Sequence, residues 1–187
     1  MNSTEIVTKT PVRLSYCYLN APRKNDDGTD GKYGAMLIIP KSDVATVKQI
    51  NEAINSARAA GAARGIRNAK NFPSPLRDGD GQKPRGGEYG PECRGCWVLN
   101  TSSKRQPKVV DRRVQPILDP DEIYSGMWAI VDINFACFSM SSNSGISCYL
   151  NNVQKIRDDE PLGGSAARPE DVFTAQDVNG EDDGLGL

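Results

Sequence analysis

The side chains best suited to chemistry in this sequence are cations that gather between residues 104 and 113. Five lysines and arginines lie in this stretch, interrupted by one acidic residue, Asp111. Cations at this density, in a segment that we expect to be extended, are typical of a groove that tracks the phosphates of a nucleic-acid strand. Two further cations, in a Gly- and Pro-rich excursion over residues 61–95, are expected to close over the strand. The candidate phosphate contacts are Lys104, Arg105, Lys108, Arg112 and Arg113, together with Arg77 and Lys83.

Aromatic residues supply the second requirement of such a groove. A strand bound without sequence preference stacks its bases on aromatic rings, which contribute about 1–3 kcal/mol per base. Trp128, Phe138 and Tyr149 are predicted to lie on strand faces opposite the aliphatic core. One alternative stays open: the basic runs are ordinary solvated surface and the rings complete a secondary core. Further aromatic candidates are Tyr33, Tyr89 and Trp97.

The other reactive residues give weaker support to metal or nucleophilic chemistry. Cys93 and Cys96 form half of a zinc-ribbon pattern, but no second pair lies at the right spacing. The chain has no His, which excludes Ser-His-Asp and Cys-His arrangements. Four carboxylates could hold two Mg²⁺ ions for phosphodiester cleavage, although Asp-Pro-Asp-Glu is equally typical of a turn that enters a short helix, and we prefer that interpretation. The four carboxylates are Asp111, Asp119, Asp121 and Glu122. We predict no catalytic residue, no metal and no cofactor.

Short apolar runs predict the strands that must position these groups. In the first strand, Val12, Leu14, Tyr16 and Tyr18 are expected to share one face. Small polar residues predict a loop over 139–145. The predicted strands cover residues 11–19, 33–39, 96–100, 127–138 and 146–150.

One helix is predicted over residues 42–60, with Ser42 as its N-cap. Short strands with one inserted helix and long loops describe a small barrel better than a parallel α/β sheet. We therefore predict a mainly β fold, an OB-fold-like small barrel. The apolar face of the helix, with steps of three and four residues, consists of Val44, Val47, Ile50, Ile54 and Ala57.

Charge is divided along the chain. Residues 158–187 contain nine acidic side chains and one basic one, a net charge of −8, whereas residues 1–157 contain 22 basic and 15 acidic ones, a net charge of +7. This division predicts a DNA-binding domain over 1–157 and a flexible, disordered acidic tail over 158–187. The tail is expected to compete with DNA for the basic groove and to recruit partner proteins. The tail residues assigned to these roles are Glu181, Asp182, Asp183, Leu185 and Leu187.

Several segments resemble a family of single-stranded-DNA-binding proteins from tailed phages, formerly catalogued as a domain of unknown function. The resemblance lies in the two long segments 111–126 and 145–158, in Ser74-Pro-Leu-Arg-Asp-Gly-Asp80 and in Lys32-Tyr-Gly34. It covers most of residues 10–165. It implies an oligonucleotide-binding barrel that coats single strands during replication or recombination, with an acidic tail.

The sequence as a whole predicts a non-enzymatic protein that binds single-stranded DNA without sequence preference. No apolar run approaches the roughly 20 residues that span a bilayer, and the first residues show no secretory signal. We therefore expect it in the host cytoplasm, with replication or recombination proteins as partners and a homo-oligomer as a compatible state. Two alternatives remain: a Mg²⁺-dependent nuclease or recombination enzyme, and a phage assembly or protein-interaction module.

Overall fold

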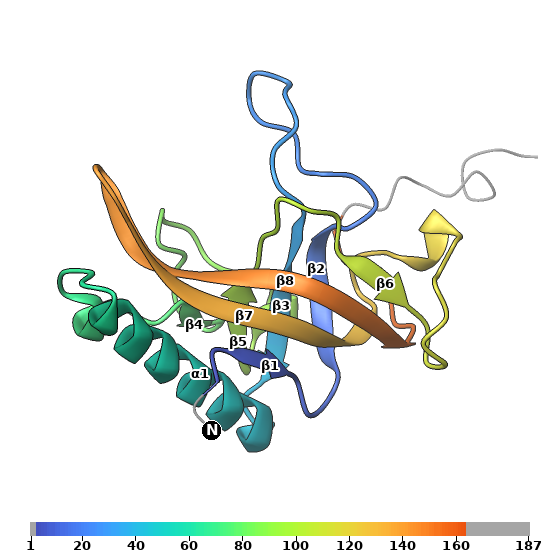
Figure 1. Cartoon of the computed structure of the whole chain (residues 1–187). Helices are drawn as coiled ribbons and strands as arrows, with labels where there is room; N and C mark the ends of the chain where they lie inside the picture. Colours follow the sequence, from blue (N-terminus) through green and yellow to red (C-terminus); the bar gives the residue numbers. More distant parts are fainter. Residues whose placement is uncertain (1–2, 164–187) are drawn as a thin grey trace, which may run out of the picture.

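The computed structural model describes residues 3–163 of the 187-residue chain. They form a strongly curved sheet with one long helix packed along it and long loops projecting from it (Figure 1). This arrangement confirms the predicted mainly β fold with one inserted helix. The strands are β1 (Glu5–Val7), β2 (Val12–Tyr18), β3 (Gly34–Pro40), β4 (Leu76–Asp78), β5 (Cys96–Asn100), β6 (Lys108–Val110), β7 (Trp128–Met140) and β8 (Asn143–Arg157).

The sheet has the strand order β4-β5-β3-β2-β7-β8-β6, and β1 pairs with β7. All pairings are antiparallel except that of β6 with β8. The ladder itself does not close, but an isolated bridge joins Ser102, just after β5, to Tyr149 in β8. Ser102 donates its N–H to the Cys148 carbonyl at 3.0 Å and accepts from the Leu150 N–H at 3.1 Å. The strands therefore curl into a barrel-like form, with Ser102 spanning the gap.

The core follows the alternation of β7. Ala129, Val131, Ile133 and Phe135 are all buried, as expected for the inward positions of a half-buried strand. The residues between them are half-buried on the outer face. Residues of β2, β3, β5 and β8 complete the same apolar cluster.

Helix α1 (Val44–Ala63) packs against β7 and buries Ile50, Ile54 and Ala57. Its predicted N-cap, Ser42, is wrong by one residue. Asp43 is the cap, because its Oδ1 accepts from the Thr46 N–H at 3.2 Å. Val44 is consequently the first helical residue and points outward, 69% exposed, although it was assigned to the apolar face.

The first strand departs from simple alternation. Val12 and Leu14 are buried, but Tyr16 and Tyr18 are exposed, so these four residues do not share one face. The pairing of β2 with β3 shifts register between Ser15 and Tyr18. This bulge rotates both tyrosines out of the core-facing series.

The predicted loop over 139–145 is wrong as well. β7 and β8 form one long hairpin that pairs Ser139 with Ser144 and Met140 with Asn143, leaving only a two-residue turn. Backbone hydrogen bonds make this ladder, and both faces are open to solvent at its tip, so small polar side chains are tolerated there. The hairpin protrudes beyond the body at the end of the sheet near the C-terminal end of α1 (Figure 1).

Candidate nucleic-acid interface

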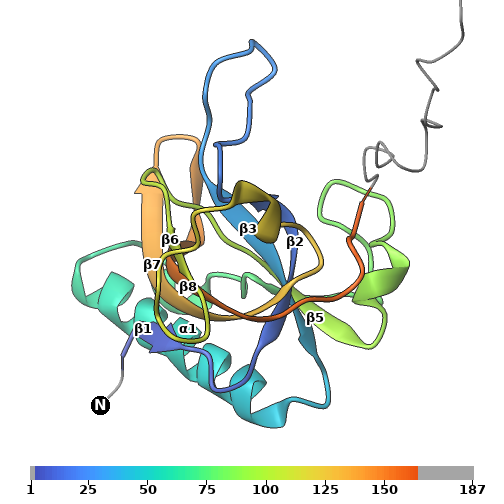
Figure 2. The same cartoon turned by 90° about the vertical axis from the view of Figure 1, so that its right-hand side faces the viewer.

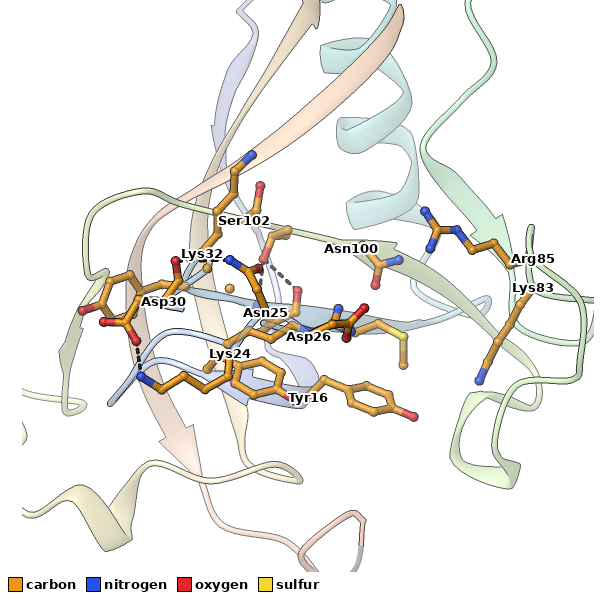
Figure 3. Close-up of a pocket in the computed structure, with 18 of the residues that line it drawn as sticks. Tyr16, Lys24, Asn25, Asp26, Asp30, Lys32, Lys83, Arg85, Asn100 and Ser102 are labelled. Carbon is orange, nitrogen blue, oxygen red and sulfur yellow. Dashed lines mark hydrogen bonds and ion pairs between the residues drawn. The ribbon is translucent and has the colours of Figure 1, made fainter. Parts of the chain in front are cut away.

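A groove of about 1200 Å³ opens between two projecting loops. One wall is the β2–β3 loop, residues 19–33, and the other is part of the excursion between β4 and β5, residues 79–95. The ends of β2, β3 and β5 form the floor. In Figure 3, Lys32 and Asp30 enter from one wall and Lys83 and Arg85 from the other, with Asn100 between them. We refer to this feature as the main groove.

The main groove is strongly basic. It contains six cations against two carboxylates, those of Asp26 and Asp30, and Lys24 forms an ion pair with Asp30. Within residues 3–163, none of the other five cations lies within ion-pair distance of a carboxylate. These charges are therefore available to phosphates. The six cations are Arg23, Lys24, Lys32, Lys83, Arg85 and Lys104.

Exposed tyrosines line the same groove. Tyr16 and Tyr18 are 56% and 38% exposed. Tyr16 has a φ of 47°, a left-handed conformation that is uncommon for an aromatic residue and often marks a functional position. Tyr33 and Tyr89 are half-buried in the groove walls, and the Lys83 ammonium lies 5.8 Å from the centre of the Tyr89 ring. The main groove thus combines cations with rings on which bases can stack.

The base of the excursion is fixed by an ion-pair network. The Lys41 ammonium lies 2.7 Å from an Asp78 carboxylate oxygen and 2.8 Å from one of Asp80, and it holds the pKa of both carboxyls below their usual range. Asp80 also accepts from the Gly95 N–H at 3.0 Å, and Gly79 donates its N–H to the Cys96 carbonyl at 2.9 Å. The Asp-Gly-Asp part of the 74–80 motif therefore joins the two ends of the loop that carries Lys83 and Arg85.

A smaller, second groove of about 360 Å³ adjoins the main groove. Both are lined by Asn100, Thr101 and Ser102, so the segment after β5 forms their common floor. Arg77 and Phe138 lie in the second groove, among serines and prolines. A strand could therefore continue from one groove into the other.

The contacts predicted from the sequence lie at different places in the structure. Lys83 and Lys104 line the main groove, and Arg77 and Phe138 line the second. Tyr149 is exposed on β8 and pairs through its backbone with Ser102 on the groove floor. The predicted contacts that line neither groove are Arg105, Lys108, Arg112, Arg113, Trp128 and Tyr149.

Trp128 is held by residues of the chain itself. Its Nε1–H donates to an Asp159 carboxylate oxygen at 2.8 Å, and the Arg157 guanidinium lies 4.3 Å from the centre of its ring. Trp97 is likewise partnered, with the Lys41 ammonium 5.2 Å from its ring. Whether Trp128 contacts bases stays a prediction.

The carboxylates considered for Mg²⁺ organise backbone turns. Asp111 Oδ1 accepts from the N–H groups of Arg113 at 2.8 Å and Gln115 at 3.0 Å. Asp119 caps the short 3₁₀ helix Pro120–Glu122 by accepting from the Asp121 N–H at 2.9 Å. The interpretation of Asp-Pro-Asp-Glu as a turn that enters a short helix is confirmed.

The two cysteines of the half zinc pattern have a packing role. Cys93 is buried in an apolar cluster with Met36, Ile38 and Val98, and Cys96 packs against it. Burial raises the pKa of the Cys93 thiol to about 11, so this thiol is protonated at neutral pH.

The chain leaves the barrel along the side of this same cluster. After β8, residues 158–163 cross to the excursion between β4 and β5 (Figure 2). Leu162 packs against the Cys93 cluster and donates its N–H to the Ser125 carbonyl at 2.8 Å. Met36 and Tyr89, which line the main groove, belong to or pack against that cluster. The acidic segment therefore starts close to the main groove; its candidate residues Glu181, Asp182, Asp183, Leu185 and Leu187 lie outside the described residues.

Comparison with known proteins decides the family. A family model described as the single-stranded-DNA-binding protein of Enterobacter phage Enc34 matches residues 4–184. The chain belongs to this family. The resemblance to phage single-stranded-DNA-binding proteins that the sequence motifs indicated is thereby confirmed.

Solved structures and a curated relative resemble this chain over most of its length. The Enc34 family protein, solved in complex with single-stranded DNA, is 29% identical and superposes with a TM-score of 0.69, covering 85% of this chain and 88% of that chain. The single-stranded-DNA-binding protein gp2.5 of bacteriophage T7 is 15% identical, with a TM-score of 0.60 over 98% of both chains, a likeness of fold alone. Protein p50 of Acyrthosiphon pisum secondary endosymbiont phage 1 is 29% identical over 171 residues, 86% of this chain and 88% of its own length.

Sequence reasoning missed the tyrosines of the β2 bulge and the cations of the β2–β3 loop. Tyr16 and Tyr18 were placed by strict alternation, which cannot anticipate a register shift. A usable signal for the loop was the spacing of Arg23, Lys24 and Lys32 around an Asx- and Gly-rich turn.

No helix within residues 3–163 is long and apolar enough to cross a membrane.

Proposed function

We propose that this protein binds single-stranded DNA without sequence preference in the main groove and continues the strand into the second groove. The observation that carries this proposal is the meeting, in one groove, of the exposed rings of Tyr16 and Tyr18 with five cations that have no ion-pair partner among residues 3–163. The family's Enc34 structure in complex with single-stranded DNA supports the choice of ligand.

The cations and the tyrosine rings have different roles in binding. Cations attract the phosphates of any nucleic acid, so they supply affinity without distinguishing single strands from duplexes. Tyrosine rings need the face of a base, which a duplex keeps stacked on its neighbours. Preference for single strands therefore comes from Tyr16, Tyr18 and, in the second groove, Phe138.

We propose a binding role without a catalytic step, in phage replication or recombination in the host cytoplasm. The family is one of DNA-binding proteins, and the carboxylates of Asp111 and Asp119 accept backbone N–H groups. Among residues 3–163, no group of three or more Asp, Glu, Cys or His side chains is placed to hold a metal ion.

The acidic segment gives this binding an internal competitor. Its residue Leu162 packs on the Cys93 cluster, close to the main groove, and residues 158–187 carry a net charge of −8. Tethering keeps the segment at a high effective concentration near the cations of the groove, so DNA must displace it.

The salt dependence of binding tests the electrostatic part. If the cations of the main groove neutralise about four phosphates, the logarithm of the binding constant for oligo(dT) falls with the logarithm of salt concentration at a slope near −3. Replacing Lys32 and Lys83 together by Gln should make that slope shallower by about 1.4, since each phosphate contact on a single strand contributes about 0.7. Fluorescence anisotropy at several salt concentrations measures the slope.

Lys48→Gln is the matched control, because Lys48 lies on α1 outside both grooves and pairs with Glu52 at 3.9 Å. It should leave the slope unchanged. An unchanged slope in the Lys32→Gln, Lys83→Gln variant would place the phosphates elsewhere.

A further inference from the structure

The end of the molecule beyond the second groove is formed by two segments that carry no carboxylate. Residues 53–77 run from α1 to β4 and contain five cations, and residues 133–154 of β7 and β8 contain no charged side chain. The two segments pack together through Ala69, Phe72 and Cys137, which form one buried cluster. Figure 1 shows the tip of the β7–β8 hairpin and the C-terminal end of α1 at the same end of the molecule. The charge that these segments present there is therefore entirely positive.

Two of the five cations hold the connection between α1 and β4 in place. Arg58 donates from Nε and Nη2 to the Phe72 carbonyl at 3.0 and 2.8 Å, and Arg64 donates from Nη2 to the Cys137 carbonyl at 3.0 Å. The connection is therefore bonded both to the helix and to the β7–β8 hairpin, and its surface is formed before any ligand binds.

Two further cations, Arg67 and Lys70, lie on this connection without a partner. Both side chains are exposed, and within residues 3–163 neither is at ion-pair distance from a carboxylate. The dipole of α1 does not account for them, because its attraction for cations falls off within the last turn. The helix ends at Ala63 with Arg64 as its C-cap, so both cations lie beyond it.

The second groove leads onto the same connection. Pro73 lines that groove and follows Lys70 by three residues, at most about 11 Å along the chain. Ile146, on the β8 side of the groove, packs against the buried cluster that includes Ala69. A strand that leaves the second groove past Pro73 therefore meets Lys70 first and Arg67 next.

We propose that Arg67 and Lys70 bind phosphates of a single DNA strand that continues beyond the second groove, so that the bound length exceeds what the two grooves hold. This proposal rests on the proposed function, because it extends the path of the same strand. Phe72 is the one aromatic residue within 53–77, and it is buried. The surface therefore contributes charge without base stacking, and its contacts should not depend on the bases.

The length dependence of binding tests the proposal. Oligo(dT) of about 6 nucleotides should stay within the grooves and one of about 16 should reach beyond them, both within the usual range for such folds. The salt slope should be steeper by about 1.4 for the longer strand, since each phosphate contact contributes about 0.7. Replacing Arg67 and Lys70 together by Gln should remove this difference. It should weaken binding of the longer strand about tenfold in about 0.1 M salt and leave the shorter strand unchanged.

Lys9→Gln with Lys48→Gln is the matched control. It also removes two exposed positive charges, and both residues lie outside 53–77 and line neither groove. Its affinity for both lengths should equal that of the native chain. Urea midpoints close to the native value confirm that each variant keeps its fold.

Two results with the Arg67→Gln, Lys70→Gln variant would overturn the proposal: unchanged binding of both lengths, and equal weakening of both. The Lys32→Gln, Lys83→Gln variant should weaken both lengths, because its cations lie in the main groove. Failure of the groove itself would therefore be seen separately, as native binding by that variant.

An abasic extension separates phosphates from bases. The shorter oligo(dT) is extended by abasic residues, at its 5′ end or its 3′ end, to the length of the longer one. One of the two should bind about as tightly as the longer oligo(dT) and lose that gain in the Arg67→Gln, Lys70→Gln variant. If neither extension strengthens binding, bases rather than phosphates make the additional contact, and the assignment to Arg67 and Lys70 is wrong.

Discussion

Replacing Tyr16 and Tyr18 together by Ala should weaken binding to oligo(dT) about thirtyfold or more. Each ring that stacks on a base contributes about 1–3 kcal/mol, so loss of both removes at least about 2 kcal/mol. The exposed rings lie outside the core, and the substitution should leave the free energy of unfolding within about 1 kcal/mol of the native value. Anisotropy titration with a fluorescent oligo(dT) measures the affinity, and urea unfolding measures the stability.

The matched control replaces both tyrosines by Phe. It keeps the stacking faces and removes only the hydroxyl groups, so the affinity should stay within about threefold of the native value. A further test is Tyr16→Gly, which removes the ring and places at this position a residue that adopts the φ of 47° without strain. A folded Tyr16→Ala, Tyr18→Ala variant with native affinity would show that bases do not stack at the bulge.

Gly79→Ala should destabilise the protein by about 2–3 kcal/mol and weaken DNA binding as well. A Cβ at this position would lie 2.2 Å from the Cys93 carbonyl oxygen and 2.7 Å from that of Cys96. Both oxygens belong to the backbone, so the two ends of the excursion must move apart. Because Lys83 and Arg85 lie on that excursion, their wall of the main groove would shift with it.

Gly145→Ala is the control for this effect. Its Cβ would lie 3.5 Å from the nearest atom, Phe138 Cε1, which is ordinary van der Waals contact. Its urea midpoint should match that of the native protein. A Gly79→Ala variant with a native midpoint would show that the base of the excursion is not tightly held.

The regular parts of the fold could be predicted from the sequence because each follows one periodicity. The alternation in β7 places Val131 and Ile133 in the core, and three-and-four spacing places Ile50 and Ile54 there from α1. Prediction failed where the backbone departs from a period. The bulge in β2 exposes Tyr16, and the continued hairpin between β7 and β8 is made by backbone bonds to which side chains give no clue.

The candidate site was only partly predictable, because it is assembled across the sequence. Lys83 and Lys104 were identified by charge density and do meet in the main groove. Arg112 and Arg113 belong to the same basic run in the sequence, but the tight hairpin after β6 directs them away from both grooves. Nearness in sequence predicted one cluster where the fold makes two surfaces.

The position at which the body ends affects how the acidic segment should be removed. Beyond Arg157, Asp159 bonds the Trp128 indole and Leu162 packs on the Cys93 cluster. A chain that ends at Arg157 would lose these contacts together with the acidic residues. A chain that ends at Gly163 keeps the contacts and removes seven of the ten charged residues beyond Arg157.

The most direct measurement is a titration of fluorescent oligo(dT), and of a duplex of equal length, with the full chain and with a chain that ends at Gly163. We predict that both proteins bind oligo(dT) at least tenfold more tightly than the duplex, and that the shorter chain binds oligo(dT) more tightly than the full chain. Equal and weak binding of both polymers by both proteins would contradict the account, because the grooves would then act only as a general polyanion surface.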